Sequence, residues 1–472
     1  MIRHSTRSPF GWMTNMVFVG RMFVVLSLVG SVMMFFAIWN LDSHERSNTL
    51  VADVQKSELQ MRDKMEEMFH KMEDLSAQLE TIKKGMTNNL FHYFNENEWP
   101  DLWGTTPRPH SFDKEPTAGS TIPYWLREEI RNTPIVYTFV NGSIPEYREQ
   151  RKKYCPISPP ERCVGGGRDR TNDELRYSLR SLQKNIPWHK GHIYIVAPKD
   201  HHPYWLNVSH PRIHMVDQED LFPDDIREHL PTFSSTAIEP HLWRAVPEGT
   251  RNFIYINDDC FIGQPMRPVD FFTSTGQGNV LYLEPSVVHA TQKKWEEWNE
   301  KHQKIWLAGV YKSILRIKER FPDTPGQPTT YHFLKHAPFV INREALKNIS
   351  TIWHEDFKTT AAHRFRHTDD VFAVWMHTYY VYHTFPKSQF RVWNVENGKT
   401  AMKLFKATAK VEEFQQTIEW IRENKPIIYT INDSGYGKPV AELFSEFMEA
   451  EFPQPSIFER RDQLPTTTSP RK

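Results

Sequence analysis

The sequence of 472 residues predicts an α/β fold with a mainly parallel sheet and helices on both faces. Short apolar runs rich in β-branched residues recur along the chain, and an amphipathic helical pattern lies between the first two. Strands that alternate with helices favour parallel pairing, because a crossover helix returns the chain to the same end of the sheet. Two of the runs end abruptly in polar residues, which predicts a polar edge.

The elements of this sheet are expected in a fixed order. The predicted strands are the apolar runs 135–140, 192–197, 212–216 and 253–256. A helix is expected over 172–185, with Asn172 as its N-cap. On this helix Arg176 and Arg180 share one face, either exposed to solvent or available to an anion.

The strand at 253–256 runs into Asn257, Asp258 and Asp259. Adjacent carboxylates at the carboxyl end of a strand are suitable ligands for Mg²⁺ or Mn²⁺, which normally arrive with a substrate phosphate. The alternative is an Asx-rich turn that caps a hairpin. Asn141 and Gly142 end the first strand and should lie at the same edge, which favours a ligand site over a simple turn.

Three further segments carry polar clusters. The glycines and arginines of 163–170 precede the helix and fit either a phosphate cradle or a flexible surface loop. His336 precedes an apolar run, and 361–375 brings together Arg364, Arg366, His367, Asp369 and Asp370. Such a set could bind a sugar phosphate and move a proton. Near the end, 427–437 forms another strand that runs into Asn432 and Asp433.

The N-terminal region predicts a membrane anchor. Residues 22–41 contain no charge and would span about 30 Å as a helix. Arginines precede the segment and acids follow it, so 1–21 should be cytosolic and the rest lumenal, in a type II, single-pass, Golgi membrane protein. A cleaved signal peptide is the competing interpretation, but no small-residue cleavage site ends the run. The N-x-S/T sequons fit a lumenal chain: Asn141, Asn207, Asn348 and Asn432.

The segment 42–95 predicts a coiled-coil stalk. Its apolar residues alternate at steps of four and three, as an a/d seam requires: Met61, Met65, Met68, Met72, Leu75, Leu79, Ile82 and Met86. We expect a homo-oligomer through this seam, although an amphipathic helix lying on the catalytic domain has the same pattern. Residues 96–134 form a proline-rich linker with a short helix near 125–131, and 461–472 a polar, disordered tail.

Composition limits the partners. Lys+Arg and Asp+Glu are both 58, so no bulk charge favours nucleic acid and no nucleic-acid partner is expected. The chain has 3 cysteines, of which Cys155 and Cys163 are close enough to close a small disulfide loop, leaving Cys260. No cysteine or histidine spacing typical of zinc is present, so no structural zinc is expected.

The motifs resemble those of the Stealth family. This family includes bacterial capsular polysaccharide phosphotransferases and the alpha/beta subunit precursor of animal N-acetylglucosamine-1-phosphotransferase. The matching blocks occur in the family order: IVYTFVNGS (135–143), NDELRYSLRSL (172–182), FSSTAIE (233–239), FIYINDDCFIG (253–263), HAPFVINREAL (336–346), RFRHTDD (364–370), YTINDSG (429–435) and FPQPSIFE (452–459). The resemblance implies a Stealth-like catalytic domain over 135–460, with a nucleotide-diphospho-sugar-transferase-like sheet.

The resemblance also implies a reaction. A glycan hydroxyl would attack the phosphorus nearer the sugar in a UDP-sugar, and sugar-1-phosphate, with N-acetylglucosamine-1-phosphate among the candidates, would be transferred as UMP leaves. A divalent cation, Mg²⁺ or Mn²⁺, would bind the diphosphate. The implied roles are metal binding for Asp258, Asp259 and Asp433; phosphate binding for Arg366; general base for His336 with His367 as fallback; a catalytic place for Asp369; and substrate binding for Asn141, Gly142, Asn172, Arg176 and Asn432.

One position departs from the family pattern. An aspartate commonly precedes the Asn-x-Glu-Leu block, and here the residue is Thr171. Two alternatives therefore stay open beside the phosphotransferase. The chain could be a catalytically altered subunit that binds the sugar nucleotide for a partner enzyme, or a conventional metal-dependent glycosyltransferase.

Overall fold

The computed structural model describes residues 124–164, 171–273, 278–322, 330–386, 389–394, 402–433, 435 and 437–460. These residues belong to the second of two compact units of the chain, 93–472. The predicted anchor at 22–41, the stalk, the glycine loop at 165–170 and the tail at 461–472 lie outside them. Within the described ranges, no helix is both long enough and apolar enough to span a membrane.

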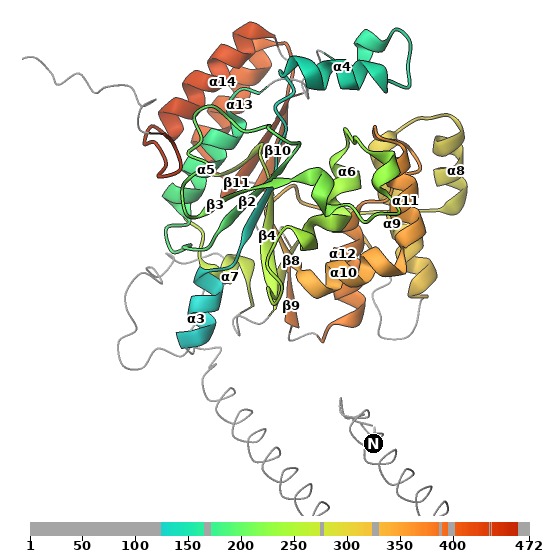
Figure 1. The fold of residues 1–472 in the computed structure, drawn as a ribbon. Helices are drawn as coiled ribbons and strands as arrows, with labels where there is room; N and C mark the ends of the chain where they lie inside the picture. Colours follow the sequence, from blue (N-terminus) through green and yellow to red (C-terminus); the bar gives the residue numbers. More distant parts are fainter. Residues whose placement is uncertain are drawn as a thin grey trace, which may run out of the picture. The chain divides into compact units, whose positions relative to one another are not determined.

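The central sheet has five strands in the order β3-β2-β1-β4-β8 (Figure 1). They are β1 (Ile135–Thr138), β2 (Ile193–Ala197), β3 (Ile213–Asp217), β4 (Asn252–Asn257) and β8 (Phe339–Asn342). The first four pair in parallel, whereas β8 is antiparallel to β4. The predicted mainly parallel sheet is therefore confirmed, and each predicted strand lies within two residues of its expected bounds.

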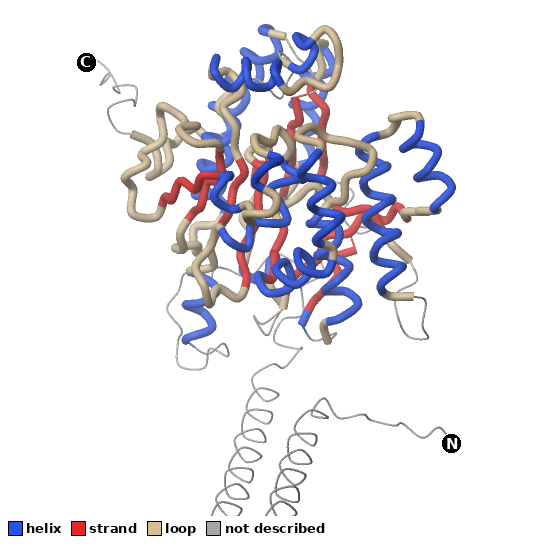
Figure 2. The backbone as a smooth tube through the Cα atoms, turned by 45° about the vertical axis from the view of Figure 1, so that its right-hand side comes forward, coloured by secondary structure: helices blue, strands red, loops and turns tan. Residues whose placement is uncertain are grey.

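Helices cover both faces of this sheet, as Figure 2 shows. Because side chains alternate along a strand, β4 contributes to two separate cores. Ile254 and Ile256 pack beneath α3 (Tyr124–Arg131) and α5 (Glu174–Asn185). Phe253 and Tyr255 pack beneath the helices of the other face, α9 (Ile305–Arg320), α10 (Arg343–Ile352) and α12 (Ala373–Thr384).

Two smaller sheets flank the central one. The first has the order β10-β11-β5 and consists of β10 (Met402–Ala407), β11 (Ile428–Asp433) and β5 (Cys260–Ile262), packed against α13 (Val411–Asn424) and α14 (Lys438–Glu451). The second has the order β7-β6-β9, with β6 (Asn279–Val287), β7 (His332–Leu334) and β9 (Phe390–Asn394). Because β5 follows β4 after a two-residue turn, the first small sheet continues directly from the central strand.

The remaining described elements are short or peripheral. The helices are α4 (Pro145–Lys153), α6 (Ser235–Ile238), α7 (Pro268–Phe271), α8 (Gln292–Glu300) and α11 (His354–Ala362). The 3-10 turns are η2 (Pro160–Cys163), η4 (Gln218–Leu221), η5 (Arg227–His229) and η6 (Glu239–Arg244).

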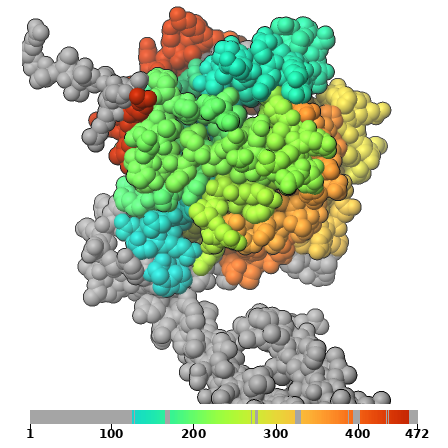
Figure 3. Space-filling view, viewed as in Figure 1, coloured from blue at the N-terminus to red at the C-terminus, as the bar shows by residue number. Residues whose placement is uncertain are grey.

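A disulfide joins Cys155 to Cys163, so the pairing considered from the spacing is confirmed, and Cys260 is free and buried. The bond closes the loop after α4, and α4 with this loop forms the teal region at the top of Figure 3. Tyr147 of α4 contacts the ring of Phe233, which precedes α6. Arg151 of α4 donates from Nε to the carbonyl of Cys163 at 2.9 Å. Its guanidinium also lies over the rings of Phe233 and Phe365. The disulfide loop is thus attached to the segment that carries Arg366.

The start of α5 differs from the prediction. The helix begins at Glu174, and the residue in the N-cap position is Asp173, which has a left-handed φ of 62°. Asn172 instead donates from its side-chain amide to Glu174 at 2.9 Å. Asn172 is therefore not the N-cap, because its side chain is held by the first helical carboxylate.

Arg176 and Arg180 of α5 are held by one buried carboxylate. Glu459 accepts from Arg176 Nε at 2.7 Å and from Arg180 Nε at 2.8 Å, and its side chain is 1% exposed. Burial acts to raise the pKa of Glu459, but hydrogen bonds from Arg180, the backbone of Ser456 and Arg176 outweigh it and lower the pKa. These arginines therefore attach the C-terminal segment to α5.

Candidate functional site

The candidate site lies at the carboxyl edge of the central sheet. β1 and β4 are neighbours, with Thr138 opposite Asn257, and the chain order reverses between them. Such a reversal is where open α/β sheets bind ligands. Asn141 and Gly142 follow β1, and Asp258 and Asp259 follow β4. The convergence predicted from the strand ends is therefore present.

Three carboxylates gather on one side of this edge. Removal from water, together with Asp259 and Glu174 nearby, raises the pKa of Asp258 well above its ordinary value. Burial likewise raises the pKa of Glu174, which begins α5, with a further contribution from Asp259. Like charges held close together and away from water disfavour ionisation unless a cation joins them.

Asn432 and His336 lie beside the same carboxylates. Asn432 donates from Nδ2 to Asp259 at 3.4 Å. The His336 ring lies between Asn257 Nδ2, 3.1 Å from its Nε2, and Thr430 Oγ1, 3.2 Å from its Nδ1. Because an amide nitrogen only donates, this arrangement assigns the lone pair to Nε2 and the proton to Nδ1. The His336 ring is thus held by Asn257, the residue directly before Asp258, and by Thr430.

The other side of the edge carries a cation. Arg366 donates from a terminal nitrogen to Ser235 Oγ at 3.1 Å. Its neighbour Glu239 lies at the end of the FSSTAIE block, and burial raises the pKa of Glu239 to about 7, against opposing effects of Arg366, Tyr255 and Ser235. A carboxyl group that titrates near neutral pH is suited to proton transfer.

Tyr255 connects the two sides. Its hydroxyl lies 3.1 Å from Thr138 Oγ1 and donates to Glu239 at 3.4 Å. Burial raises the pKa of Tyr255 well above 10, and the charges of Glu239 and Asp258 act in the same direction. One buried phenol is therefore within electrostatic reach of both the acidic cluster and the Arg366 side.

The acidic cluster is chemically suited to a divalent cation. Asp259 Oδ1 is buried and accepts no hydrogen bond from any described residue. Among the described residues, no group of three or more His, Cys, Asp or Glu side chains has the arrangement of a complete metal site. Mg²⁺ commonly binds through one or two carboxylates together with waters and substrate phosphates, so Asp258 and Asp259 fit this partial ligand set.

The pair His367 and Asp369 has other partners. The His367 ring stacks on His363 with centroids 4.0 Å apart, and its pKa is lowered by partial burial and by His363. Asp369 forms an ion pair with Lys312 of α9 at 2.7 Å. These contacts hold the 363–370 loop that presents Arg366, and catalytic roles for His367 and Asp369 stay predictions.

The predicted substrate-binding residues have these local partners. Asn141 Oδ1 accepts from the backbone and hydroxyl of Ser143 at 3.1 and 2.5 Å, and the Gly142 carbonyl accepts from Arg148 at 3.2 Å. Asp433 Oδ1 accepts from Gly435 N at 2.7 Å. Asn172 donates to Glu174, and Arg176 donates to Glu459. Substrate or metal contacts of these side chains stay predictions.

Sequence reasoning did not assign roles to two residues of the site, Glu174 and Glu239. Each lies inside a quoted block, NDELRYSLRSL and FSSTAIE. A lone glutamate beside an apolar helix pattern has no distinctive spacing, so the pattern indicated a helix and not a site. Thr171, which departs from the family pattern, donates to Glu174 at 3.5 Å. A carboxylate is therefore present next to the position where an aspartate is usual.

Comparisons with known proteins identify the relatives of this chain. Residues 168–280 match the model of Stealth protein CR2, conserved region 2, and 335–383 match Stealth protein CR3, conserved region 3. Two exopolysaccharide phosphotransferases of Streptomyces coelicolor, SCO2594 and SCO6023, are each 31% identical, over 69% and 72% of this chain. The matches cover 51% and 54% of those relatives, so the chain matches about half of their length.

The mouse N-acetylglucosamine-1-phosphotransferase subunits alpha/beta are 44% identical over 121 residues, 25% of this chain and 9% of that protein. Among solved structures, the galactosyltransferase LgtC aligns with 67% of this chain and 96% of its own at 11% identity, with a TM-score of 0.31, too low to assign a fold. Residues 168–280 and 335–383 are thus Stealth conserved regions 2 and 3, and the resemblance of this chain to the Stealth proteins is confirmed.

Proposed function

We propose that this protein transfers a sugar-1-phosphate from a UDP-sugar to a hydroxyl group of a glycan and releases UMP. N-Acetylglucosamine-1-phosphate is one candidate for the transferred group, because one relative is named N-acetylglucosamine-1-phosphotransferase subunits alpha/beta. The proposal rests on one observation: a buried carboxylate oxygen and a buried guanidinium nitrogen at the same sheet edge each lack a partner among the described residues. They are Asp259 Oδ1 and Arg366 Nε.

These two unpartnered atoms fit a metal-bound diphosphate. A carboxylate oxygen accepts a cation, and a guanidinium N–H donates to a phosphate oxygen. In phosphoryl transfer, negative charge is spread over the equatorial oxygens of the attacked phosphorus, where a guanidinium stabilises it. In a glycosyl transfer, positive charge instead develops at the sugar carbon. A guanidinium beside that carbon would not stabilise this charge.

The side chains of the site have distinct tasks in this proposal. Asp258 and Asp259, with Asp433 as a further candidate, hold Mg²⁺ or Mn²⁺, which neutralises diphosphate charge when bound. Arg366 donates to the transferred phosphoryl group. His336 accepts the proton of the glycan hydroxyl at Nε2, after Asn257 turns away from that nitrogen, while Thr430 keeps the other ring nitrogen protonated.

The cellular setting is proposed from the sequence. We place the chain in the Golgi membrane as a type II protein, with 22–41 as its single span, the catalytic domain in the lumen and the 42–95 stalk joining copies into a homo-oligomer. The Cys155–Cys163 disulfide supports the lumenal side, since such bonds persist in oxidising compartments.

The test traces one phosphorus atom of the donor into the products. The purified chain is given Mg²⁺, a glycan acceptor and a UDP-sugar that is radiolabelled at the phosphorus nearer the sugar. We expect UMP as the nucleotide product and the label in the glycan, with both lost in Arg366→Ala. Label recovered in UDP, with unlabelled sugar on the glycan, would identify a glycosyltransferase instead.

The second candidate is a sugar-nucleotide-binding subunit without turnover, favoured by Thr171. In that case the chain binds UDP-sugar in a metal-dependent way but forms no UMP, and Thr171→Asp introduces turnover. If the unchanged chain forms UMP at a rate that Thr171→Asp does not increase, the candidate is excluded. The hydrogen bond of Thr171 to Glu174 predicts this second outcome, because the carboxylate is already present.

A further inference from the structure

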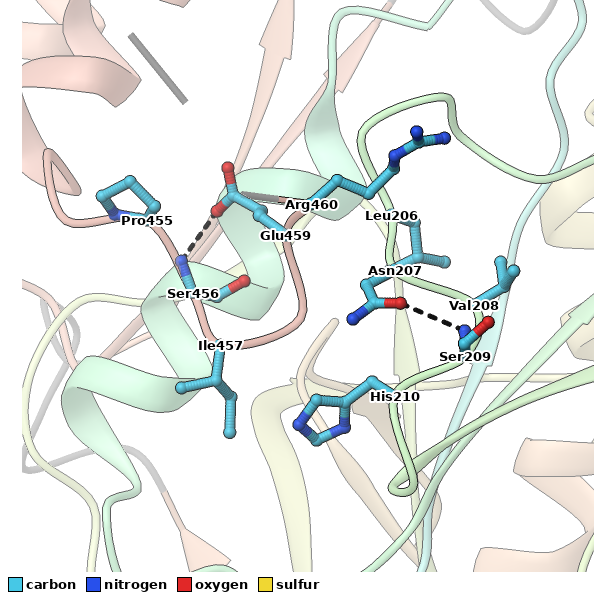
Figure 4. Close-up of a pocket in the computed structure, with 10 residues that line it drawn as sticks. All are labelled: Leu206, Asn207, Val208, Ser209, His210, Pro455, Ser456, Ile457, Glu459 and Arg460. Carbon is cyan, nitrogen blue, oxygen red and sulfur yellow. Dashed lines mark hydrogen bonds between the residues drawn. The ribbon is translucent and has the colours of Figure 1, made fainter. Parts of the chain in front are cut away.

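A surface cavity of about 1100 Å³ lies between the loop after β2 and the C-terminal segment (Figure 4). Its walls are residues 206–210 on one side and 455–457 with 459–460 on the other. Backbone contacts join the walls: Asn207 N donates to Phe458 O at 2.8 Å, and Arg460 N donates to Trp205 O at 2.8 Å. The cavity is as large as sites that hold drug-sized ligands, roughly 300–1,000 Å³.

Exposed apolar side chains lie around this cavity. Val208 is 43% exposed and Ile457 is 53% exposed, on opposite walls. Tyr204, on the loop that leads into the cavity, is 64% exposed. Exposed apolar side chains that cluster around a concave surface mark a place where another group packs.

Asn207 projects into this cavity. Its Oδ1 accepts from Ser209 N at 3.2 Å, which turns the amide nitrogen toward the open space between Ile457 and His210 (Figure 4). Asn207, Val208 and Ser209 form an N-x-S sequon, and Ser209 is exposed. The required hydroxyl is therefore at the surface, and the reactive nitrogen belongs to the half-buried Asn207 that lines the cavity.

In each of the other sequons the asparagine or the hydroxyl residue has a hydrogen-bond partner in the folded chain, although Asn348 itself is exposed. Asn432 donates its amide nitrogen to Asp259 inside the candidate site. The Asn141 side chain accepts from the hydroxyl of its own sequon, Ser143, at 2.5 Å. Asn348 lies within α10, and the hydroxyl of Ser350 donates to Pro240 O at 2.6 Å.

We propose that Asn207 carries an N-linked glycan whose first sugars occupy this cavity and cover Val208 and Ile457. The proposal rests on the lumenal orientation included in the proposed function. In the modification, Asn207 Nδ2 loses a proton and bonds to C1 of an oligosaccharide, whose lipid diphosphate departs; no oxidant or reductant is needed. The lipid-diphosphate-linked oligosaccharide is supplied by the secretory pathway.

The glycan would also protect the attachment of the C-terminal segment. The C-terminal wall of the cavity contains Glu459, which holds Arg176 and Arg180 of α5. Sugars packed on Ile457 keep water and proteases from this wall. Removal of the glycan should therefore increase cleavage near 453–457, without a direct effect on the carboxyl edge of the sheet.

The test measures occupancy of each sequon. The full chain is produced in animal cells, treated with peptide N-glycosidase in ¹⁸O water and digested, and the converted asparagines are identified by mass spectrometry. We expect conversion at Asn207 and none at Asn432. Ser209→Ala should remove the Asn207 glycan, whereas the matched variant Ser209→Thr should retain it. An unconverted Asn207 in the unchanged chain overturns the proposal.

Limited proteolysis separates a glycan that fills the cavity from one that extends into solvent. The Ser209→Ala chain should be cleaved near 453–457 at least several-fold faster than the Ser209→Thr chain. Equal rates overturn the placement in the cavity. Transfer activity is measured on the same preparations, so an inactive chain with a glycan at Asn207 refutes the proposed function alone, and an active chain with a bare Asn207 refutes this inference alone.

Discussion

At the residue scale, the site is defined by two buried atoms of charged side chains that lack a hydrogen-bond partner among the described residues. Asp259 Oδ1 and Arg366 Nε are buried without hydrogen bonds to described residues, and the pKa of Asp258 is raised well above its ordinary value by burial and neighbouring carboxylates. Groups in such environments disfavour the folded state until a ligand joins them. Without a ligand, these groups therefore lower the stability of the folded chain.

The first prediction concerns Asp258 and Asp259. Asp→Asn at either position should lower turnover by more than about 100-fold, because a cation on the diphosphate loses a charged ligand. The metal-free variants should be at least as stable as the unchanged chain, because a repelled charge is removed. If Asn257, Asp258 and Asp259 only cap a turn, stability instead falls by about 1 kcal/mol and activity persists. Thermal melts and turnover assays on the same samples distinguish these results.

The second prediction concerns Glu239, whose pKa is about 7 because of burial. If the ionised form positions Arg366, activity should rise as the pH increases through about 7, and Glu239→Gln should be slower and lack this rise. The raised pKa means that the folded chain holds this proton more tightly than the unfolded chain does. Stability should therefore decrease as the pH rises from about 4.5 through 7, and Glu239→Gln should remove that decrease.

Activity profiles and denaturation midpoints at pH 5 and 7.5 measure both effects. Tyr255→Phe is a suitable comparison, because it removes the hydrogen bond to Glu239 and keeps the ring. A Glu239→Gln chain with an unchanged pH profile would show that Glu239 has no part in positioning Arg366.

At the element scale, one helix serves two purposes. The N-terminus of α5 brings Glu174 to the carboxylates after β4, while its next turns hold the C-terminal segment through Glu459. Leu175, Leu179 and Leu182 on the same helix are buried in the core beneath the sheet. The site and the end of the domain are therefore connected through one rigid element.

The third prediction concerns Glu459. Glu459→Gln should lower the free energy of unfolding by about 3 kcal/mol, because it leaves Arg176 and Arg180 buried without a full counter-charge. Glu449→Gln is the matched control: Glu449 also pairs with Arg180, but its side chain is 52% exposed, so a loss of at most about 1 kcal/mol is expected. Urea denaturation measures both.

The lowered pKa of Glu459 also predicts a pH effect. Its stabilising contribution is present above the ordinary carboxyl pKa of about 4.5 and is lost as the pH falls through the lower folded value. The Gln variant should not show this loss. Equal stabilities of the two variants at neutral pH would mean that the C-terminal segment is held by its apolar contacts alone.

At the scale of the whole molecule, the described domain is proposed to be one part of a membrane-anchored oligomer. The anchor and the stalk lie outside the described residues, so both stay predictions from the sequence. The heptad seam at 61–86 predicts association without any contribution from the carboxyl edge of the sheet. Substitutions in the stalk should therefore change the oligomeric state without changing the transfer activity.

The fourth prediction tests that separation. Replacing Met68, Leu75 and Leu79 by glutamate should reduce the particle mass measured by light scattering, because charges in an a/d seam prevent its burial. Activity per chain should be retained within about two-fold, since the variant changes no residue of the carboxyl edge of the sheet and independent sites contribute additively. Glutamate at the outward-facing heptad positions His70, Ala77 and Thr81 is the control and should leave the mass unchanged. A constant mass for the seam variant would place the seam on another surface.

The sequence by itself determined the main strands, the polar edge after β1 and β4 and the likeness to the Stealth proteins. Local patterns suffice for these features, since apolar alternation and a run such as Asn257-Asp258-Asp259 depend on neighbours in the chain. Only the tertiary structure decided which distant groups meet. Glu239, 16 residues from Tyr255, and Glu459, 283 residues from Arg176, acquire their partners and pKa shifts from burial. Burial depends on the packing of the whole chain, and no local spacing encodes it.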